Sequence, residues 1–226
     1  MIFFSRTVKG QAREDNRDAL GALFDGVRGV FVIADGTSRP GSGDLARTLT
    51  NHLINDYQNR LAKGFSDSSR ESVALLLRGL MQDAHASLYS NGFEGSASYL
   101  VAVVVAGFLA VAYEGDCCAG VVMSGGTVSW LTAPHCLANW RRDRSHRQLA
   151  TDSGRHHISR CFKARKQPDP EIVTRAMGKG EKLVLATDGF WADLSDMVQA
   201  RLLEADWTAA PEVDDDASWI VVQMPA

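Results

Sequence analysis

VFVIADGTSRPGSGDLA, residues 30–46, is the segment that decides the fold. It begins with a short run of β-branched and aromatic residues, which is typical of a buried strand. The run ends at Asp35, and glycine-rich residues then lead into a segment with a helical pattern. A carboxylate at the end of a buried strand is costly unless something compensates its charge. Asp35 is therefore the first candidate for a functional side chain.

Other acids occupy comparable positions. Asp188 directly follows the apolar run LVLAT and, like Asp35, precedes a glycine. Further acids lie in a Gly-Asp turn, before the run SWIVV and at the end of the first segment: Asp116, Asp215 and Asp18. Mg²⁺ and Mn²⁺ prefer such oxygen ligands, and a glycine lets a backbone carbonyl approach an ion closely. The pattern predicts a site for a hard divalent cation.

The remaining periodicities indicate an α+β fold. Apolar residues every fourth position from Leu45 to Leu61 predict one helix, and a second apolar stripe runs from Val73 to Leu88. Strands are predicted at 29–35, 99–106, 108–114, 119–124, 127–131, 182–187 and 218–224, with a short helix near 194–204. The four central strands follow one another closely, as in a meander. Helices in one block and antiparallel strands in another favour α+β over alternating α/β, and we expect one domain over residues 1–226.

Composition and charge limit the functional classes. Lys and Arg number 24 against 27 Asp and Glu, which does not favour nucleic acid as a partner. The start of the chain lacks the features of a signal peptide, and the longest apolar run, 99–113, is too short to span a bilayer comfortably. The four cysteines show no CxxC spacing. These features predict a cytoplasmic protein with reduced thiols and no membrane partner, and we expect a monomer.

Six motifs in order resemble the protein phosphatase 2C family of metal-dependent Ser/Thr phosphatases. The match runs through nearly the whole chain: REDNRD (13–18), VFVIADGTSRPGSGDLA (30–46), GSASYLVAVV (95–104) with YEGDCC (113–118), LTAPH (131–135), LVLATDGFW (183–191) and DDDASWIVV (214–222). The resemblance implies an αββα sandwich of two antiparallel sheets flanked by helix pairs. It also implies hydrolysis of phosphoserine and phosphothreonine by a hydroxide that bridges two metal ions, Mn²⁺ or Mg²⁺.

The resemblance also assigns roles to residues. The metal-binding set that it implies is Asp18, Asp35, Gly36, Asp116, Asp188 and Asp215. In that set Asp35 would bridge two ions, the Gly36 carbonyl would bind one of them, and Asp18 would hold a metal-bound water. Asp188 and Asp215 would bind the second ion, and Asp116 a third. Arg13 would hold the substrate phosphate, since a guanidinium contacts phosphate oxygens in a bidentate manner.

The stretch 139–166 matches the variable flap of that family. It holds nine Lys and Arg against Asp143 and Asp152. We expect it to lie beside the active site and to help select phosphoprotein substrates of a Ser/Thr kinase through Arg141, Arg142 and Arg144.

Three alternatives depend on local features. Arg17 and Thr37 replace residues common in the family, which leaves open a catalytically impaired member that binds phosphoproteins. Cys136 and Arg142 have the Cys-x₅-Arg spacing of cysteine-dependent phosphatases, although the intervening residues include no glycine. The glycines from position 41 fit a dinucleotide-binding loop only loosely, because the strand ends at Asp35 and a second helix stands where a strand is needed.

Overall fold

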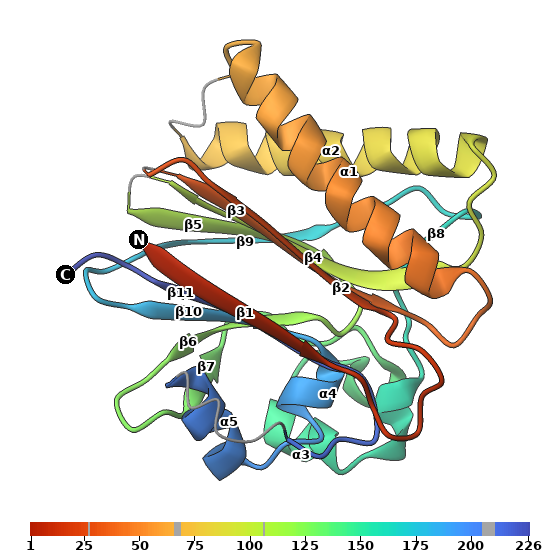
Figure 1. Ribbon diagram of the computed structural model, residues 1–226, viewed down its shortest axis with the longest axis vertical. Helices are drawn as coiled ribbons and strands as arrows, with labels where there is room; N and C mark the ends of the chain where they lie inside the picture. Colours follow the sequence, from red (N-terminus) through yellow and green to blue (C-terminus); the bar gives the residue numbers. More distant parts are fainter. Residues whose placement is uncertain (27, 66–68, 106, 205–210) are drawn as a thin grey trace.

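A computed structural model describes residues 1–26, 28–65, 69–105, 107–204 and 211–226. Two antiparallel sheets lie face to face (Figure 1). The six-stranded sheet contains β2 (Asp18–Phe24), β3 (Gly29–Gly36), β4 (Ser96–Val105), β5 (Phe108–Glu114) and β9 (Glu171–Ala176), with β8 (Phe162–Lys163) paired to β4. The five-stranded sheet has the order β1 (Ile2–Val8), β11 (Ala217–Gln223), β10 (Lys182–Ala186), β6 (Cys118–Val122) and β7 (Val128–Trp130).

Helices cover the outer faces of both sheets, so the predicted α+β sandwich of four layers is confirmed (Figure 1). The long helices α1 (Ser42–Ala62) and α2 (Arg70–Ser90) pack on the six-stranded sheet. The opposite layer is built from shorter pieces: the α-helices α3 (His146–Ala150), α4 (Asp188–Trp191) and α5 (Asp196–Leu203), and the 3₁₀ helices η1 (Leu137–Asn139) and η2 (Ser153–His156). The backbone ladders of both sheets are antiparallel, which excludes the parallel sheet of a dinucleotide-binding fold.

Strand β3 is buried on both faces, which explains its continuous apolar sequence. Val30, Val32 and Ala34 pack toward α1 and α2, whereas Phe31 and Ile33 pack between the two sheets. Alternate residues of a strand point to opposite faces. Asp35 therefore continues the row of Phe31 and Ile33 and faces the space between the sheets.

The apolar stripe of α1 anchors the helical layer, as its spacing predicts. Leu45, Leu49, Leu53 and Tyr57 are fully buried against the six-stranded sheet, and Leu61 is partly buried beside them. Burying each such leucine stabilises the fold by about 1.5–3 kcal/mol. The helix begins at the glycine-rich loop after Asp35, so its packing also fixes that loop.

The prediction of one central meander is wrong. Strands β4 and β5 pair in one sheet, and β6 and β7 pair in the other, so the chain crosses between sheets at Gly115 and Asp116. The short connection resembles a hairpin turn in sequence, but the two strands it joins belong to different layers. The predicted strand at 99–106 ends at Val105 among the described residues, and residue 106 lies outside them.

Strands β1, β2 and β9 are not evident from the sequence patterns. β1 and β9 are edge strands with many exposed positions, so their apolar alternation is weak. β2 reads DALGALF, in which Ala, Leu and Gly have little strand preference. Tertiary packing decides these elements: the position of Gly21 in β2 lies against Thr50 of α1.

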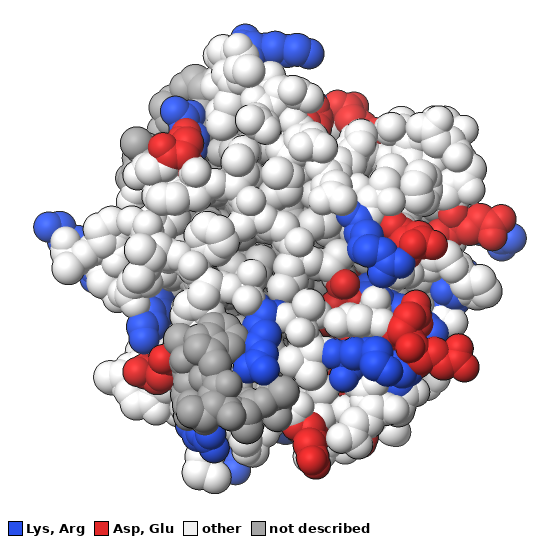
Figure 2. Space-filling view, viewed as in Figure 1, with Lys and Arg blue, Asp and Glu red and all other residues white. Residues whose placement is uncertain are grey.

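Charges of both signs are interleaved on one face of the molecule. On the face shown in Figure 2, Lys and Arg lie next to Asp and Glu and do not form a patch of one sign. Among the described residues, the structure has no helix with the length and apolar character needed to cross a membrane.

Candidate metal centre

Three carboxylates from distant parts of the chain meet at one end of the sandwich. One oxygen each of Asp35, Asp116 and Asp188 lies within 4.8 Å of the other two. Asp35 comes from β3, Asp116 from the crossover between β5 and β6, and Asp188 from the start of α4. These three residues are called the acidic centre below. The sequence assigned all three to a metal site, and the fold brings them together.

Backbone geometry places Asp116 at this point. Gly115 has a φ of +106°, a conformation that residues with side chains rarely adopt. The space for a side chain there is also taken by Ser98 of β4. In addition, the indole Nε1 of Trp191 donates a hydrogen bond to the Asp116 carbonyl at 2.9 Å. The crossover is therefore held on both sides, and Asp116 is directed toward the centre.

The acidic centre brings groups of like charge close together in a buried place. Burial raises the pKa of Asp35, Asp116 and Asp188 above its usual range, and the charges of neighbouring aspartates raise it further. Like charges at such short range destabilise one another unless a counter-ion or protons intervene. The arrangement therefore favours binding of cations.

Asp18 lies next to the acidic centre. It pairs with Asp35 across the β2–β3 ladder, and its Oδ2 accepts a hydrogen bond from Thr187 Oγ1 at 2.9 Å. Its Oδ1 atom and the Oδ1 atom of Asp116 are buried and have no hydrogen-bond partner among the described residues. Buried polar atoms without partners are costly. A hard divalent cation would supply the missing partner, so the residues present fit such an ion.

Asp215 is committed to an ion pair. Arg13 Nε and Nη2 donate to its Oδ1 and Oδ2 at 2.6 and 2.5 Å, a bidentate arrangement. Although burial alone raises its pKa, the hydrogen bonds from Arg13 hold the pKa of Asp215 below the usual value. The structure thus pairs Arg13, which was expected to bind the substrate phosphate, with Asp215, which was expected to bind metal. The sequence did not indicate this pairing.

Arg155 is a second arginine at the site, and the sequence did not indicate it. Its Nη1 donates to Asp188 Oδ2 at 2.8 Å and its Nη2 to Asp193 Oδ1 at 2.6 Å. It lies among the nine basic residues of the flap-like stretch, and nothing in their spacing distinguishes it. Only the folding of η2 onto α4 identifies it.

Asp216 was also missed as a structural residue. Its carboxylate accepts hydrogen bonds from the backbone N–H groups of Gly10 and Arg17 at 2.9 and 2.8 Å. It thereby fastens the segment that carries Arg13 and Asp18 to the start of β11. In the run DDD, the middle acid pairs with Arg13 and the last one holds the backbone.

Gly36 and Thr37 have evident packing roles. A Cβ atom at Gly36 would lie 2.5 Å from the carbonyl oxygen of Ser42, so only glycine allows α1 to start this close to β3. The Thr37 hydroxyl lies 3.1 and 2.9 Å from the hydroxyls of Ser42 and Ser96. Metal binding by the Gly36 carbonyl stays a prediction.

Two of the three basic residues expected to contact substrate already have partners within the protein. Arg142 Nη2 donates to Tyr113 and to Glu171, both at 2.8 Å, and Arg144 pairs with Asp152 at 2.6 Å. Arg141 instead lies over the exposed ring of Trp140, 4.7 Å from its centroid. Arg141 is thus the one of the three best placed to meet a partner.

Burial of its thiol and the ion pair of Arg142 disfavour Cys136 as a nucleophile. Its side chain is buried, and burial raises the pKa of the thiol, whereas a nucleophilic cysteine needs a lowered pKa. The arginine of the Cys-x₅-Arg match, Arg142, is already paired with Glu171.

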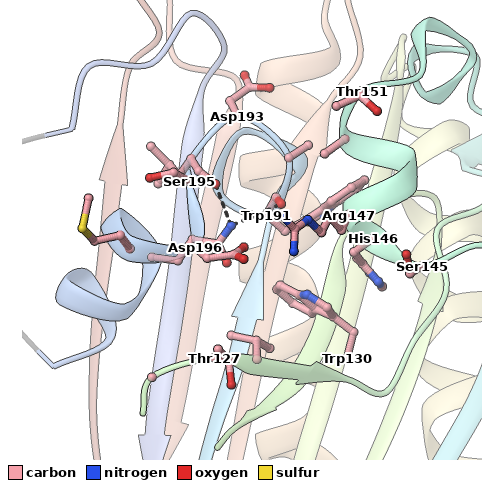
Figure 3. Close-up of a pocket in the computed structure, with 17 residues that line it drawn as sticks. Thr127, Trp130, Ser145, His146, Arg147, Thr151, Trp191, Asp193, Ser195 and Asp196 are labelled. Carbon is pink, nitrogen blue, oxygen red and sulfur yellow. Dashed lines mark hydrogen bonds between the residues drawn. The ribbon is translucent and has the colours of Figure 1, made fainter.

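A cavity of about 750 Å³ lies between α3 and α5 (Figure 3). The ring of His146 stacks on Trp130 at 4.7 Å and meets Trp191 edge to face at 5.0 Å. Asp193 lines this cavity, but the three acids of the centre do not. Judged by volume alone, this cavity would be taken as the active site. The acidic centre, however, lies on the other side of Trp191.

Comparison with known proteins gives a likeness in structure alone. No protein-family model matches the sequence, and no curated protein matches it either. Among solved structures, the S. agalactiae serine/threonine phosphatase has a TM-score of 0.76 at 17% identity, covering 100% of this chain and 99% of that one. The PPM Ser-Thr phosphatase MsPP from Mycobacterium smegmatis, in complex with cacodylate, has a TM-score of 0.76 at 19% identity, with coverage of 100% and 99%.

A third similar structure was determined with metal. It is the catalytic domain of the serine/threonine protein phosphatase PstP in complex with two manganese ions, with a TM-score of 0.71, 16% identity and coverage of 100% and 98%. These likenesses span the whole chain and confirm that it has the fold of the bacterial PPM-type Ser/Thr phosphatases, as the resemblance in sequence implied.

Proposed function

We propose that this protein is a phosphatase that requires Mn²⁺ or Mg²⁺ and removes phosphate from phosphoserine and phosphothreonine in proteins. The observation that carries the proposal is the acidic centre, whose three carboxylates have oxygens within 4.8 Å of one another, in a fold shared with Ser/Thr phosphatases. In the described part of the chain, one buried oxygen each of Asp18 and Asp116 also has no hydrogen-bond partner. Divalent ions held there would supply an activated water nucleophile and neutralise charge on the phosphoryl oxygens.

The residues of the chain have distinct tasks in this proposal. Asp35, Asp188 and Asp215 would hold two ions, with Asp18 positioned beside Asp35 through Thr187, and Asp116 is available for a third. Arg13 orients the phosphoryl group, because it lines a cavity of about 310 Å³ together with Arg155, and Arg155 contacts Asp188 of the acidic centre. There a phosphate dianion would compete with Asp215 for the guanidinium.

We infer the class of substrate from the exposed residues of the flap-like stretch. Phosphoproteins are the proposed partners, since the exposed Arg141 and Trp140 offer a charged and an aromatic surface on the flap-like stretch. Arg141→Ala should raise the KM for a phosphoprotein and leave the KM for p-nitrophenyl phosphate unchanged.

We infer a monomer that works in the cytoplasm, and the four free thiols are compatible with a reducing compartment.

The decisive test is hydrolysis of p-nitrophenyl phosphate and of phosphoserine, phosphothreonine and phosphotyrosine peptides with Mn²⁺. Activity should disappear with EDTA, survive iodoacetamide and be lost in Asp35→Asn but not in Asp44→Asn, an exposed acid on α1. Activity that survives EDTA and is lost on alkylation would overturn the proposal and favour Cys136.

One observation favours a second function, the binding of phosphoproteins without hydrolysis. Arg13 and Arg155 neutralise Asp215 and Asp188, two of the acids expected to hold metal. If these pairs persist, the centre binds metal too weakly for catalysis. Binding of a phosphopeptide with no turnover in saturating Mn²⁺ would establish this function.

A further inference from the structure

Arg155 occupies an unusual position for a flap residue. Its relative exposure is only 9%, and its Nη1 and Nη2 atoms contact Asp188, a member of the acidic centre, and Asp193, which follows α4. Burying a charged group is unfavourable unless ion pairs and hydrogen bonds compensate it. Arg155 therefore acts as a counter-ion for the acids at this side of the centre.

The surrounding segment holds Arg155 in place. Asp152 caps η2 by accepting a hydrogen bond from the Gly154 N–H at 2.8 Å, and Arg144 binds the same Asp152 side chain at 2.6 Å. The Arg155 N–H also donates to the Asp152 carbonyl at 3.0 Å. The guanidinium is thus presented by a fixed turn and connects the flap-like stretch directly to the acidic centre.

The ion pair and a divalent ion make conflicting demands on Asp188. Asp188 contributes one oxygen to the three-carboxylate group, while its Oδ2 already accepts a hydrogen bond from Arg155. A guanidinium at hydrogen-bond distance from this carboxylate would repel a divalent cation bound to the same group. Binding of both at full strength is therefore unfavourable.

We propose that Arg155 competes with the metal for Asp188. An ion that binds at Asp188 must first displace the Arg155 guanidinium, and this displacement couples metal binding to the position of η2. This inference rests on the metal site of the proposed function. Arg155 also lines the 310 Å³ cavity together with Arg13. When displaced, the guanidinium can therefore keep Asp193 and turn toward this cavity.

The test is calorimetric titration of the EDTA-stripped, dialysed protein with Mn²⁺, without any phosphate substrate. Arg155→Gln should bind Mn²⁺ at least about tenfold more tightly than the unmodified protein. Arg147→Gln is the matched control, because it removes the same charge from an exposed position of the neighbouring helix α3, and its affinity should change less than twofold. Unchanged or weaker binding by Arg155→Gln would overturn the inference and show that Arg155 orients Asp188 for the metal.

A second measurement uses the unmodified protein, in case Arg155→Gln does not fold. Mn²⁺ should increase hydrogen exchange of the backbone amides at 153–157, because displacement of Arg155 removes the contact that ties η2 to Asp188. Slower or unchanged exchange there would contradict the inference. Failure of this inference can be told apart from failure of the proposed function, because Mn²⁺ binding is measured without substrate. An inactive protein can still show competition between Arg155 and Mn²⁺, and an active protein can lack it.

Discussion

Replacing Asp35 with asparagine should stabilise the metal-free protein while abolishing its response to metal. The oxygens of Asp35, Asp116 and Asp188 are at most 4.8 Å apart. With an effective dielectric constant near 20, two ionised carboxylates at that distance repel by about 3.5 kcal/mol. Because burial raises the pKa of these groups and so reduces their ionisation, we expect a smaller gain for Asp35→Asn. A gain of about 2 kcal/mol in EDTA corresponds to roughly 4–8 °C in Tm for a chain of this size.

The assay is urea unfolding at pH 7.5, followed by far-UV circular dichroism, in EDTA and in Mn²⁺. The unmodified protein should gain about 2.7 kcal/mol at a Mn²⁺ concentration one hundred times its Kd, and Asp35→Asn should gain almost nothing. Asp44→Asn serves as control, since Asp44 is exposed and its ion pair with Arg47 lies on the surface; its stability should change by less than about 0.5 kcal/mol. An Asp35→Asn protein that is less stable in EDTA, or that keeps the full response to Mn²⁺, would refute the reasoning.

Three further predictions concern the framework of the site. Leu53→Ala should lower the free energy of unfolding by about 2–5 kcal/mol because it opens a cavity under α1, whereas Leu75→Ala, at an exposed position, should have almost no effect in the same urea titration. Gly36→Ala should reduce both stability and calorimetric Mn²⁺ affinity, since its Cβ would lie 2.5 Å from the Ser42 carbonyl; a variant equal to the unmodified protein in both would contradict this close approach. Burial lowers the pKa of His146 from 6.5 to about 3, so the neutral ring stabilises the fold above pH 6.5 and this contribution is lost as the pH falls. Relative to His146→Phe, the unmodified protein should lose about 2 kcal/mol of unfolding free energy between pH 8 and pH 5. A difference between the two proteins that does not change with pH would disprove a buried neutral imidazole.

The sequence was informative where local pattern and burial coincide. The apolar alternation of β3 and the stripe of α1 follow from periodicity, and both elements are buried along the predicted residues. The acids Asp35 and Asp188 stand out because each directly follows a buried strand and precedes a glycine. Their convergence with Asp116 could be expected from the resemblance to a known family, and the structure shows it as a distance.

Long-range charge pairing could not be predicted in the same way. The partners Arg155 and Asp188 are separated by 33 positions, and Arg13 and Asp215 by 202, with no local pattern that links them. The edge strands β1 and β9 were missed for a related reason, since an edge strand depends on its neighbour and has little apolar alternation of its own. The crossing of the chain between sheets at Gly115 is likewise decided by which layer each strand joins, and sequence spacing does not show this.

The pairing of β1 with β11 has a consequence for how the molecule forms. The ladder from Ile2 opposite Gln223 to Val8 opposite Ala217 joins the first and last strands of the sandwich. On a ribosome, the six-stranded sheet and its two long helices could assemble while β1 still waits for its partner. Contacts between such distant residues form slowly, because the long loop between them must close first. A nascent chain that stops after α4 would therefore hold Asp35, Asp116 and Asp188 but lack Asp215 and Asp216, so the surroundings of the acids are completed only when β11 and the residues before it are in place.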